Sequence, residues 1–151
     1  MNNEKFWEII NKYKDLDESD KAEKISEDLS LLEDNDIFEF YDTHYDYVNK
    51  LYSDNLWKLL ADLNGKTISN DGFEDCIGWI IGQGQETTED VVSNYENISK
   101  YVSVASDYND FENENMLYIF HRAYRIKHNI DDMNEFDKKY IEFMELDNKE
   151  F

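Results

Sequence analysis

Residues 34–52 read DNDIFEFYDTHYDYVNKLY, and this stretch carries two hydrophobic stripes at helical spacing. Side chains three or four positions apart lie on the same face of an α-helix, so each stripe marks one face. The first stripe consists of Phe38, Tyr41, Tyr45, Val48 and Tyr52, and the second of Ile37, Phe40, His44, Tyr47 and Leu51. A helix that is apolar on two adjacent faces packs against partners on both. The stretch therefore predicts a long helix at the centre of the fold.

The sequence on either side of this helix continues the helical pattern. Ser53-Asp54 marks a restart and Asn64-Gly65 a stop, because glycine readily adopts the left-handed conformation that ends helices. The stretch Ser69-Asn70-Asp71-Gly72 is typical of a cap that leads into a following helix, which Gly82-Gln83-Gly84 ends. Helical periodicity also marks residues 4–14 and 20–32, a segment that starts at Thr87 or Thr88, and the segments around Phe120 and Tyr140. Tyr101-Val102-Ser103-Val104 fits a short strand as well as the end of a helix.

Composition supports a helical reading of the whole chain. Proline and glycine are the residues that usually break helices, and the chain has no proline and only five glycines. A length of 151 residues is typical of one domain. We therefore expect an all-α, single-domain bundle of about six to seven helices over residues 1–151, with a frayed tail from Leu146.

The net charge is the strongest pointer to function. Thirty-six acidic residues against fifteen Lys and Arg give a net charge of −21, far beyond the magnitude of about 2 to 8 that keeps a small domain soluble. Such a field repels nucleic acid and anionic membranes and attracts basic surfaces. We therefore expect a basic protein as the partner, with no direct binding to nucleic acid or membrane.

Two absences bear on the compartment. The start, Met1-Asn2-Asn3-Glu4-Lys5-Phe6-Trp7, lacks the basic region and apolar run of a secretory signal. No stretch approaches the ~20 apolar residues that span a bilayer. Cys76 is the single cysteine, so an internal disulfide is excluded. These features predict a soluble, cytoplasmic protein.

The residues that carry chemistry do not form a catalytic or metal-binding motif. His44, His121 and His128 lack the spacing of a zinc site, and pairs of acids recur by chance in so acidic a chain. Cys76 has no base nearby in sequence that could activate it as a nucleophile, so we expect it to be a buried packing residue. The basic segment 121–128 is expected to pair with surrounding acids. We therefore expect no enzyme activity, no cofactor and no metal.

Two acidic clusters are the candidate partner-binding residues. Tyrosines beside acids suit an interface, where aromatic residues are favoured. The first cluster comprises Asp34, Asp36, Glu39, Asp42, Tyr45 and Asp46, and the second Glu86, Glu89 and Asp90. A third region, around Trp79 and Gln83, is the candidate for a small-ligand pocket, although Trp79 is itself expected to be buried.

Several landmarks resemble a bacterial family known as domain of unknown function 4240. They are Phe6-Trp7, Leu56-Trp57, the run from Asn70 to Asp75 followed by Gly78-Trp79-Ile80-Ile81-Gly82-Gln83-Gly84, and Glu114 with Ala123-Tyr124. The resemblance spans residues 4–128. It departs where Cys76-Ile77 replaces an aromatic-arginine pair and where a later proline is absent. It implies a helical bacterial domain and no established activity.

These observations favour an acidic binding inhibitor. The leading hypothesis is an immunity protein that neutralises a basic toxin such as a nuclease, covering the cleft that binds phosphates. The alternative is a phage-encoded mimic of nucleic acid that inhibits a host defence complex. A third hypothesis, from another class, is a small-ligand-binding domain.

Overall fold

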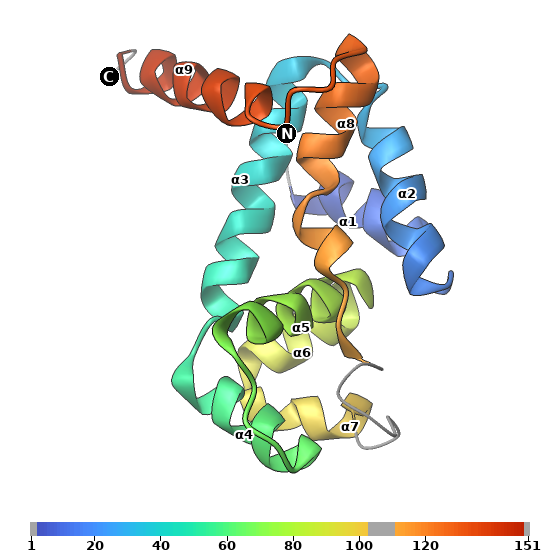
Figure 1. Cartoon of the computed structure of the whole chain (residues 1–151), viewed down its shortest axis with the longest axis vertical. Helices are drawn as coiled ribbons and strands as arrows, with labels where there is room; N and C mark the ends of the chain where they lie inside the picture. Colours follow the sequence, from blue (N-terminus) through green and yellow to red (C-terminus); the bar gives the residue numbers. More distant parts are fainter. Residues whose placement is uncertain (1–2, 103–110, 150–151) are drawn as a thin grey trace.

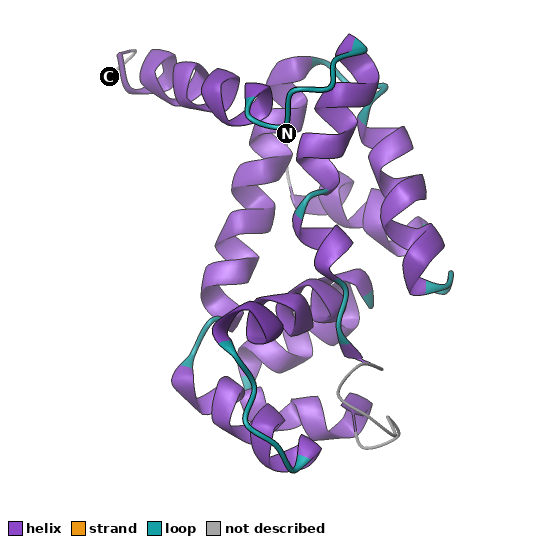
Figure 2. Cartoon of the chain, viewed as in Figure 1, coloured by secondary structure: helices purple, strands orange, loops and turns teal. Residues whose placement is uncertain are grey.

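The computed structural model describes residues 3–102 and 111–149, and in these ranges the chain forms helices joined by loops and turns, without a β-strand (Figures 1 and 2). The α-helices are α1 (Asn3–Lys12), α2 (Glu18–Leu29), α3 (Asp34–Leu51), α4 (Asp54–Asn64), α5 (Asn70–Gly82), α6 (Gln85–Ser93), α7 (Ser99–Val102), α8 (Ile119–His128) and α9 (Glu135–Lys149). The 3₁₀ helices η1 (Tyr95–Ile98) and η3 (Glu114–Leu117) also occur in the described residues. The all-α prediction is confirmed.

The expected count of six to seven helices is wrong, because the described residues alone form nine α-helices. The one-turn helix α7 follows η1 directly and is too short to show helical periodicity. For residues 101–104 the sequence fitted a short strand as well as the end of a helix. Tyr101 and Val102 are helical. Ser103 and Val104 lie outside the described residues. Helix α9 runs past Leu146 to Lys149, and the fraying expected there stays a prediction.

The central helix begins and ends where the sequence predicts. Helix α3 spans Asp34–Leu51, and extended backbone at Tyr52 and Ser53 separates it from α4. The Ser53 hydroxyl accepts a hydrogen bond from the backbone N–H of Leu56, which satisfies a donor at the start of α4. Gly65 ends α4 in the left-handed conformation, with φ of 74°.

Helices α5 and α6 are separated by a tight turn at Gly84. The Ser69 hydroxyl caps α5 by accepting from the N–H of Gly72, as predicted. Gly84 has φ of 104°, a conformation that favours glycine, and precedes the first residue of α6. The predicted cap at Thr87 or Thr88 is therefore wrong. The Thr88 hydroxyl instead donates to the carbonyls of Ile80 and Gly84, which pins α6 to α5.

The helices form two groups that α3 connects (Figure 1). In the view of Figure 1, α8 lies between the upper part of α3 and α2, and α9 starts near the top of α3, while α4, α5, α6 and α7 lie below. Helix α9 packs against α8 and α3 at its start and then projects from the body. The description of α3 as central is thus correct, since α1, α5, α6, α8 and α9 all contact it.

The core is rich in aromatic rings from both stripes of α3. Phe6 and Trp7 of α1 pack against Tyr47, whose hydroxyl accepts from the Trp7 indole N–H at 3.2 Å. Phe38 contacts Phe136 of α9 at a ring-centroid distance of 5.5 Å. Burying such rings contributes about 1.5–3 kcal/mol each, which stabilises the α1–α3 and α3–α9 contacts.

A buried lysine links the two groups of helices. Lys21 of α2 is 1% exposed and pairs with Glu18 at 2.8 Å. The Glu18 carboxylate also accepts from the amides of Gln83 at 2.9 Å and Asn113 at 2.7 Å. Because a buried charge is costly unless it is paired and hydrogen-bonded, this cluster fixes α2 against α5 and the segment before η3.

Candidate functional site

Asp34, the first residue of the acidic cluster on α3, pairs with basic side chains of the same protein. The carboxylate of Asp34 lies 2.9 Å from the Nζ of Lys127 and 2.9 Å from the Nε2 of His128, both in α8. Burial by itself raises the pKa of Asp34, but the hydrogen bonds from Lys127 and His128 outweigh burial and hold that pKa below its ordinary value. Asp34 therefore joins α3 to α8.

The basic segment 121–128 is largely neutralised internally, as predicted. Arg122 lies 3.9 Å from Glu23 of α2, and His121 lies 2.9 Å from Asp137 of α9. The expected pairing of Arg125 with an acid is not found among the described residues, and its buried Nε has no hydrogen-bond partner. The segment therefore holds α2, α3 and α9 around α8 rather than forming an exposed basic patch.

The remaining acids of the α3 cluster follow the helix toward its middle. Asp36 and Glu39 are half-buried in the first two turns. The Tyr140 hydroxyl of α9 donates to Asp42. Burial first, and this hydrogen bond second, raise the pKa of Tyr140. Asp46 is exposed, and Tyr45 beside it is 53% exposed, the value expected of a side chain available to a partner.

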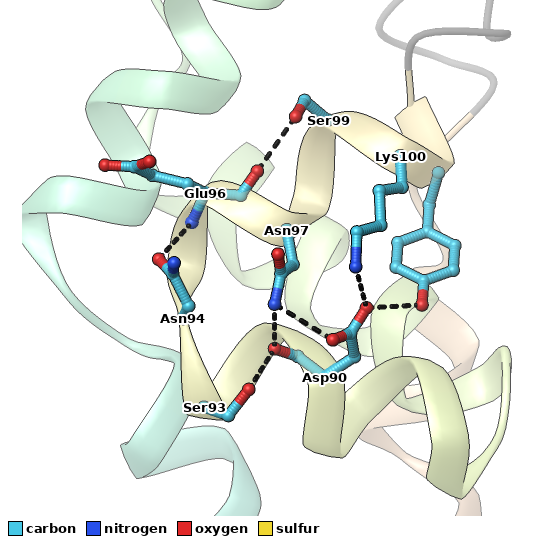
Figure 3. A network of polar contacts seen from close by, with 8 residues as sticks. Asp90, Ser93, Asn94, Glu96, Asn97, Ser99 and Lys100 are labelled. Carbon is cyan, nitrogen blue, oxygen red and sulfur yellow. Dashed lines mark hydrogen bonds and ion pairs between the residues drawn. The ribbon is translucent and has the colours of Figure 1, made fainter.

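The second acidic cluster lies on α6, whereas the first lies on α3. Glu86 and Glu89 are both exposed, and Glu89 also accepts from the Tyr47 hydroxyl of α3 at 3.2 Å. The carboxylate of Asp90 is enclosed in a polar network with η1 and α7 (Figure 3). It accepts from Tyr101 at 2.7 Å, Asn97 at 2.9 Å and Lys100 at 3.2 Å.

The hydrogen bond from Tyr101, and then that from Lys100, lower the pKa of Asp90. A carboxylate with three internal donors has little left to offer a partner. Helices α3 and α6 touch at Tyr47 and Glu89, but the two predicted clusters do not merge into one acidic face. The assignment of each cluster to partner binding stays a prediction.

A hollow beside the middle of α3 brings together side chains from distant parts of the sequence. We call it the inner hollow; it measures about 530 Å³. Its lining includes His44, Tyr52, Glu74, Tyr118, His121 and Asp137. These residues come from α3, α5, α8 and α9 and from the links between them. The volume lies in the range of about 300–1,000 Å³ that is usual for ligand pockets.

A second hollow adjoins the first along α3. We call it the outer hollow; it measures about 680 Å³ and is lined by Asp42, Asp46, Tyr140 and Met144. Tyr41, Tyr45 and Asn49 of α3 line both hollows. The two together form the α3 groove. Asp42, Tyr45 and Asp46 are the predicted site residues that line it, whereas Asp34, Asp36 and Glu39 do not.

Sequence reasoning missed His44 and His121 as site residues. His44 is 3% exposed, and burial lowers its pKa to about 4, against an opposing hydrogen bond to the backbone of Met116. Its Nε2 has no hydrogen-bond partner, and neither has the buried Nδ1 of His121. The available signal was the position of His44 within an apolar stripe, where a buried imidazole needs partners for two nitrogens.

Cys76 and the region around Trp79 and Gln83, the other candidates from the sequence, have structural roles. Cys76 is fully buried, as predicted, and burial raises the pKa of its thiol to about 12, which keeps it protonated. Trp79 is half-buried, so the prediction that it is buried is wrong, because it lies at the edge of the core against Phe111. Gln83 donates to Glu18 and to the Trp79 carbonyl, which fixes α5 against α2.

In the described part of the chain, no group of three His, Cys, Asp or Glu side chains is placed to hold a metal ion. Within the same residues, no helix is both long and apolar enough to cross a membrane. The site is therefore a polar and aromatic groove on an acidic helical protein.

The chain is thus an acidic, all-α protein with a groove lined by aromatic and polar side chains. The chain belongs to a family described as protein of unknown function, DUF4240, whose model matches residues 1–126. No curated protein and no solved structure matches the chain. The matched region ends inside α8, so α9, which supplies Asp137, Tyr140 and Met144 to the groove, lies beyond it.

Proposed function

We propose that this protein is a binding inhibitor that captures a basic protein through the α3 groove. In this proposal it acts as an immunity protein, and its partner is a basic toxin such as a nuclease. The observation that supports the proposal best is the joint position of Tyr45 and Asp46 at the groove, where both are exposed. Aromatic side chains at the centre of a polar rim are typical of protein interfaces.

The charge distribution supports a basic partner. Lys127 and Lys100 pair with acids of this chain, and Arg122 lies near Glu23. No lysine or arginine occurs among the described residues that line the groove, whereas acids line both of its parts. With a net charge of −21 behind it, the groove would draw a basic surface from a distance and speed its association.

The nucleic-acid mimic remains the competing proposal. A mimic needs an extended row of free carboxylates that takes the place of phosphates. Asp34 and Asp90 are both held by internal donors, which leaves gaps in such a row. A compact groove with exposed tyrosines suits a discrete protein contact better. A toxin gene directly upstream would favour the immunity protein, and neighbouring phage structural genes would favour the mimic.

The test begins with capture at low salt on immobilised wild-type protein, on the Tyr45→Ala/Asp46→Asn variant, and on Glu8→Gln. Glu8 is exposed on α1 and does not line the groove, so its variant controls for the loss of one charge. We expect a basic protein that wild type and Glu8→Gln retain and the groove variant loses. Equal retention by all three would contradict the proposed surface.

The captured partner then allows a kinetic test. Its association rate should fall steeply as salt rises, because the Debye length shrinks from about 10 Å at 0.1 M to about 3 Å at 1 M. Added protein should also abolish the partner's activity in a direct assay, for example DNA or RNA cleavage. An association rate independent of salt would argue against electrostatic capture, and undiminished activity against inhibition.

A further inference from the structure

The inner hollow offers hydrogen-bond acceptors in unusual number. Besides the carboxylates of Glu74 and Asp137, it is lined by two imidazoles, those of His44 and His121. Each imidazole has a buried nitrogen without a partner. Buried polar atoms are nearly always hydrogen-bonded, so these two atoms call for a ligand that the protein itself does not supply.

The unpartnered nitrogen of His44 is an acceptor. Its ring makes a hydrogen bond to the backbone of Met116 in η3, and since Nε2 has no partner, Nδ1 is the atom that makes it. This bond favours the charged form of the ring, as a donor bond to a carbonyl does, so Nδ1 carries the proton. Nε2 of the neutral ring then presents a lone pair.

The same reasoning applies to His121. Its Nε2 lies 2.9 Å from Oδ1 of Asp137, and an ionised carboxylate only accepts hydrogen bonds. The Nε2 must therefore carry the proton and donate it. Nδ1 is left buried and without a partner, and in the neutral form of the ring it accepts a hydrogen bond. In its neutral form, each of the two imidazoles thus has one unpartnered nitrogen that can receive a hydrogen bond.

Aromatic rings complete the hollow. Tyr41 and Tyr118 both pack edge-on against His121, with ring-centroid distances of 5.9 Å and 5.7 Å. Tyr45 and Tyr118 are 53% and 46% exposed, so the aromatic wall reaches the surface. Tyrosine faces attract cations, and they attract a planar guanidinium by stacking as well.

We propose that the inner hollow is a binding site for a guanidinium group. A guanidinium is planar, permanently charged, and carries five N–H donors and no acceptor, which complements a hollow of acceptors between aromatic faces. His44 Nε2 and His121 Nδ1 would receive N–H donors at the buried end. Glu74 and Asp137 would balance the charge, and Tyr45 and Tyr118 would cover the ligand.

The guanidinium can come from two sources. One is an arginine side chain of the basic partner, and for this source alone the inference rests on the proposed function. The other is a free small molecule that carries a guanidinium. The chemistry of recognition is the same in both cases, so the binding site can be tested before the source is known.

The test is a titration of the full-length protein with N-acetyl-arginine amide. The matched control ligand is N-acetyl-citrulline amide, a neutral molecule of nearly the same shape. Binding is followed by calorimetry and by ¹⁵N NMR of the histidine rings. We expect the arginine derivative to bind at least about tenfold more tightly than the citrulline derivative, and to shift the ring nitrogens of His44 and His121. Equal binding of both ligands, or unchanged ring signals, would overturn the proposal.

Two variants locate the site. His44→Phe keeps an aromatic ring and removes the acceptor, and Tyr45→Ala removes an exposed wall without touching the core. Each should weaken binding about tenfold or more, whereas Glu8→Gln on α1 should not. If His44→Phe does not fold, Tyr45→Ala and the ring signals of the wild-type protein decide the question. Undiminished binding by Tyr45→Ala would place the ligand elsewhere and overturn the proposal.

A further comparison distinguishes the sources and separates this proposal from the first. Tighter binding of an acetylated Gly-Gly-Arg-Gly-Gly amide than of the single residue indicates a side chain presented by a protein. Tighter binding of free arginine than of either blocked form indicates a small molecule. If arginine derivatives bind but no basic protein is captured, the guanidinium site stands and the proposed inhibitor function fails.

Discussion

Gly78 of α5 lies so close to the backbone of Asn113 that an added Cβ would sit 2.5 Å from its carbonyl oxygen. The Asn113 N–H in turn donates to the Asp75 carbonyl at 2.9 Å, and Met116 packs near Gly82 one turn further along α5. Glycines four residues apart thus give α5 a smooth face on which η3 rests. This contact brings Met116 to the ring of His44 and so helps to build the inner hollow.

Gly78→Ala should destabilise the protein by about 1–3 kcal/mol. Alanine is the better helix former by about 1 kcal/mol, but the added methyl group meets a backbone oxygen, which cannot move aside as a side chain can. Gly82→Ala is the matched control, since its nearest obstacle is the flexible Lys21 side chain at 3.2 Å. Urea denaturation followed by circular dichroism measures both. A loss for Gly82→Ala as large as for Gly78→Ala would contradict this reasoning.

Glu18→Ala should destabilise the protein by about 2 kcal/mol, because it leaves the buried Lys21 ammonium without its carboxylate. This predicted loss of stability is below the ~3–5 kcal/mol found for fully buried pairs. The Glu18 side chain is 35% exposed, so water can partly replace its carboxylate beside Lys21. The Glu18→Ala/Lys21→Met double variant removes both charges and should recover part of the loss. A double variant less stable than Glu18→Ala would show that the pair does not act through charge compensation.

His44→Phe should change how stability depends on pH. The folded protein lowers the pKa of His44 from 6.5 to about 4, so between these values the unfolded chain binds the extra proton and the folded chain does not. Wild type therefore loses free energy of unfolding as the pH falls through this window, by at most about 1.4 kcal/mol per pH unit from this group. The stability difference between His44→Phe and wild type should shift in favour of the variant from pH 7 to pH 4. A constant difference would argue against a buried, neutral His44.

Asp75→Asn should have the opposite dependence. Burial first, and then repulsion by Glu114 and Glu112, raise the pKa of Asp75 from 3.8 to about 6. The folded state binds the proton more readily between these values, so wild type loses stability as the pH rises through them and the carboxyl ionises. The variant should thus be more stable than wild type at pH 7, and this gain should vanish near pH 4. Thermal melts across the pH range measure it, and a gain that persists at pH 4 would exclude ionisation as its cause.

Local features of the sequence predicted much of the fold. The two stripes in residues 34–52 predicted α3, and Ser53, Gly65 and Ser69 marked boundaries that the structure confirms. These signals can be read because capping and helical periodicity involve residues within a few positions of each other. The count of helices was wrong because an element such as α7 is a single turn, and the predicted start of α6 was wrong because glycine rather than threonine precedes that helix.

The sequence also supplied Asp42, Tyr45 and Asp46 as candidate residues, because dense charge beside tyrosine is visible along the chain. It could not show that Asp34 is held by Lys127 and His128, or Asp90 by Lys100 and Tyr101. Whether a carboxylate is free depends on donors that fold next to it. The acidic composition thus predicts a basic partner, but it does not show which acids would face that partner.

By itself, the sequence determined that this protein is helical, acidic and built around the helix at residues 34–52, since these properties follow from composition and from spacing within each helix. Only the tertiary structure decided that His44 and His121 share a hollow with Glu74 and Asp137. Those four residues belong to α3, α8, α5 and α9, which meet only when the helices pack. The physical reason is that burial and hydrogen-bond partners are set by contacts between distant segments, and no pattern within a single segment records them.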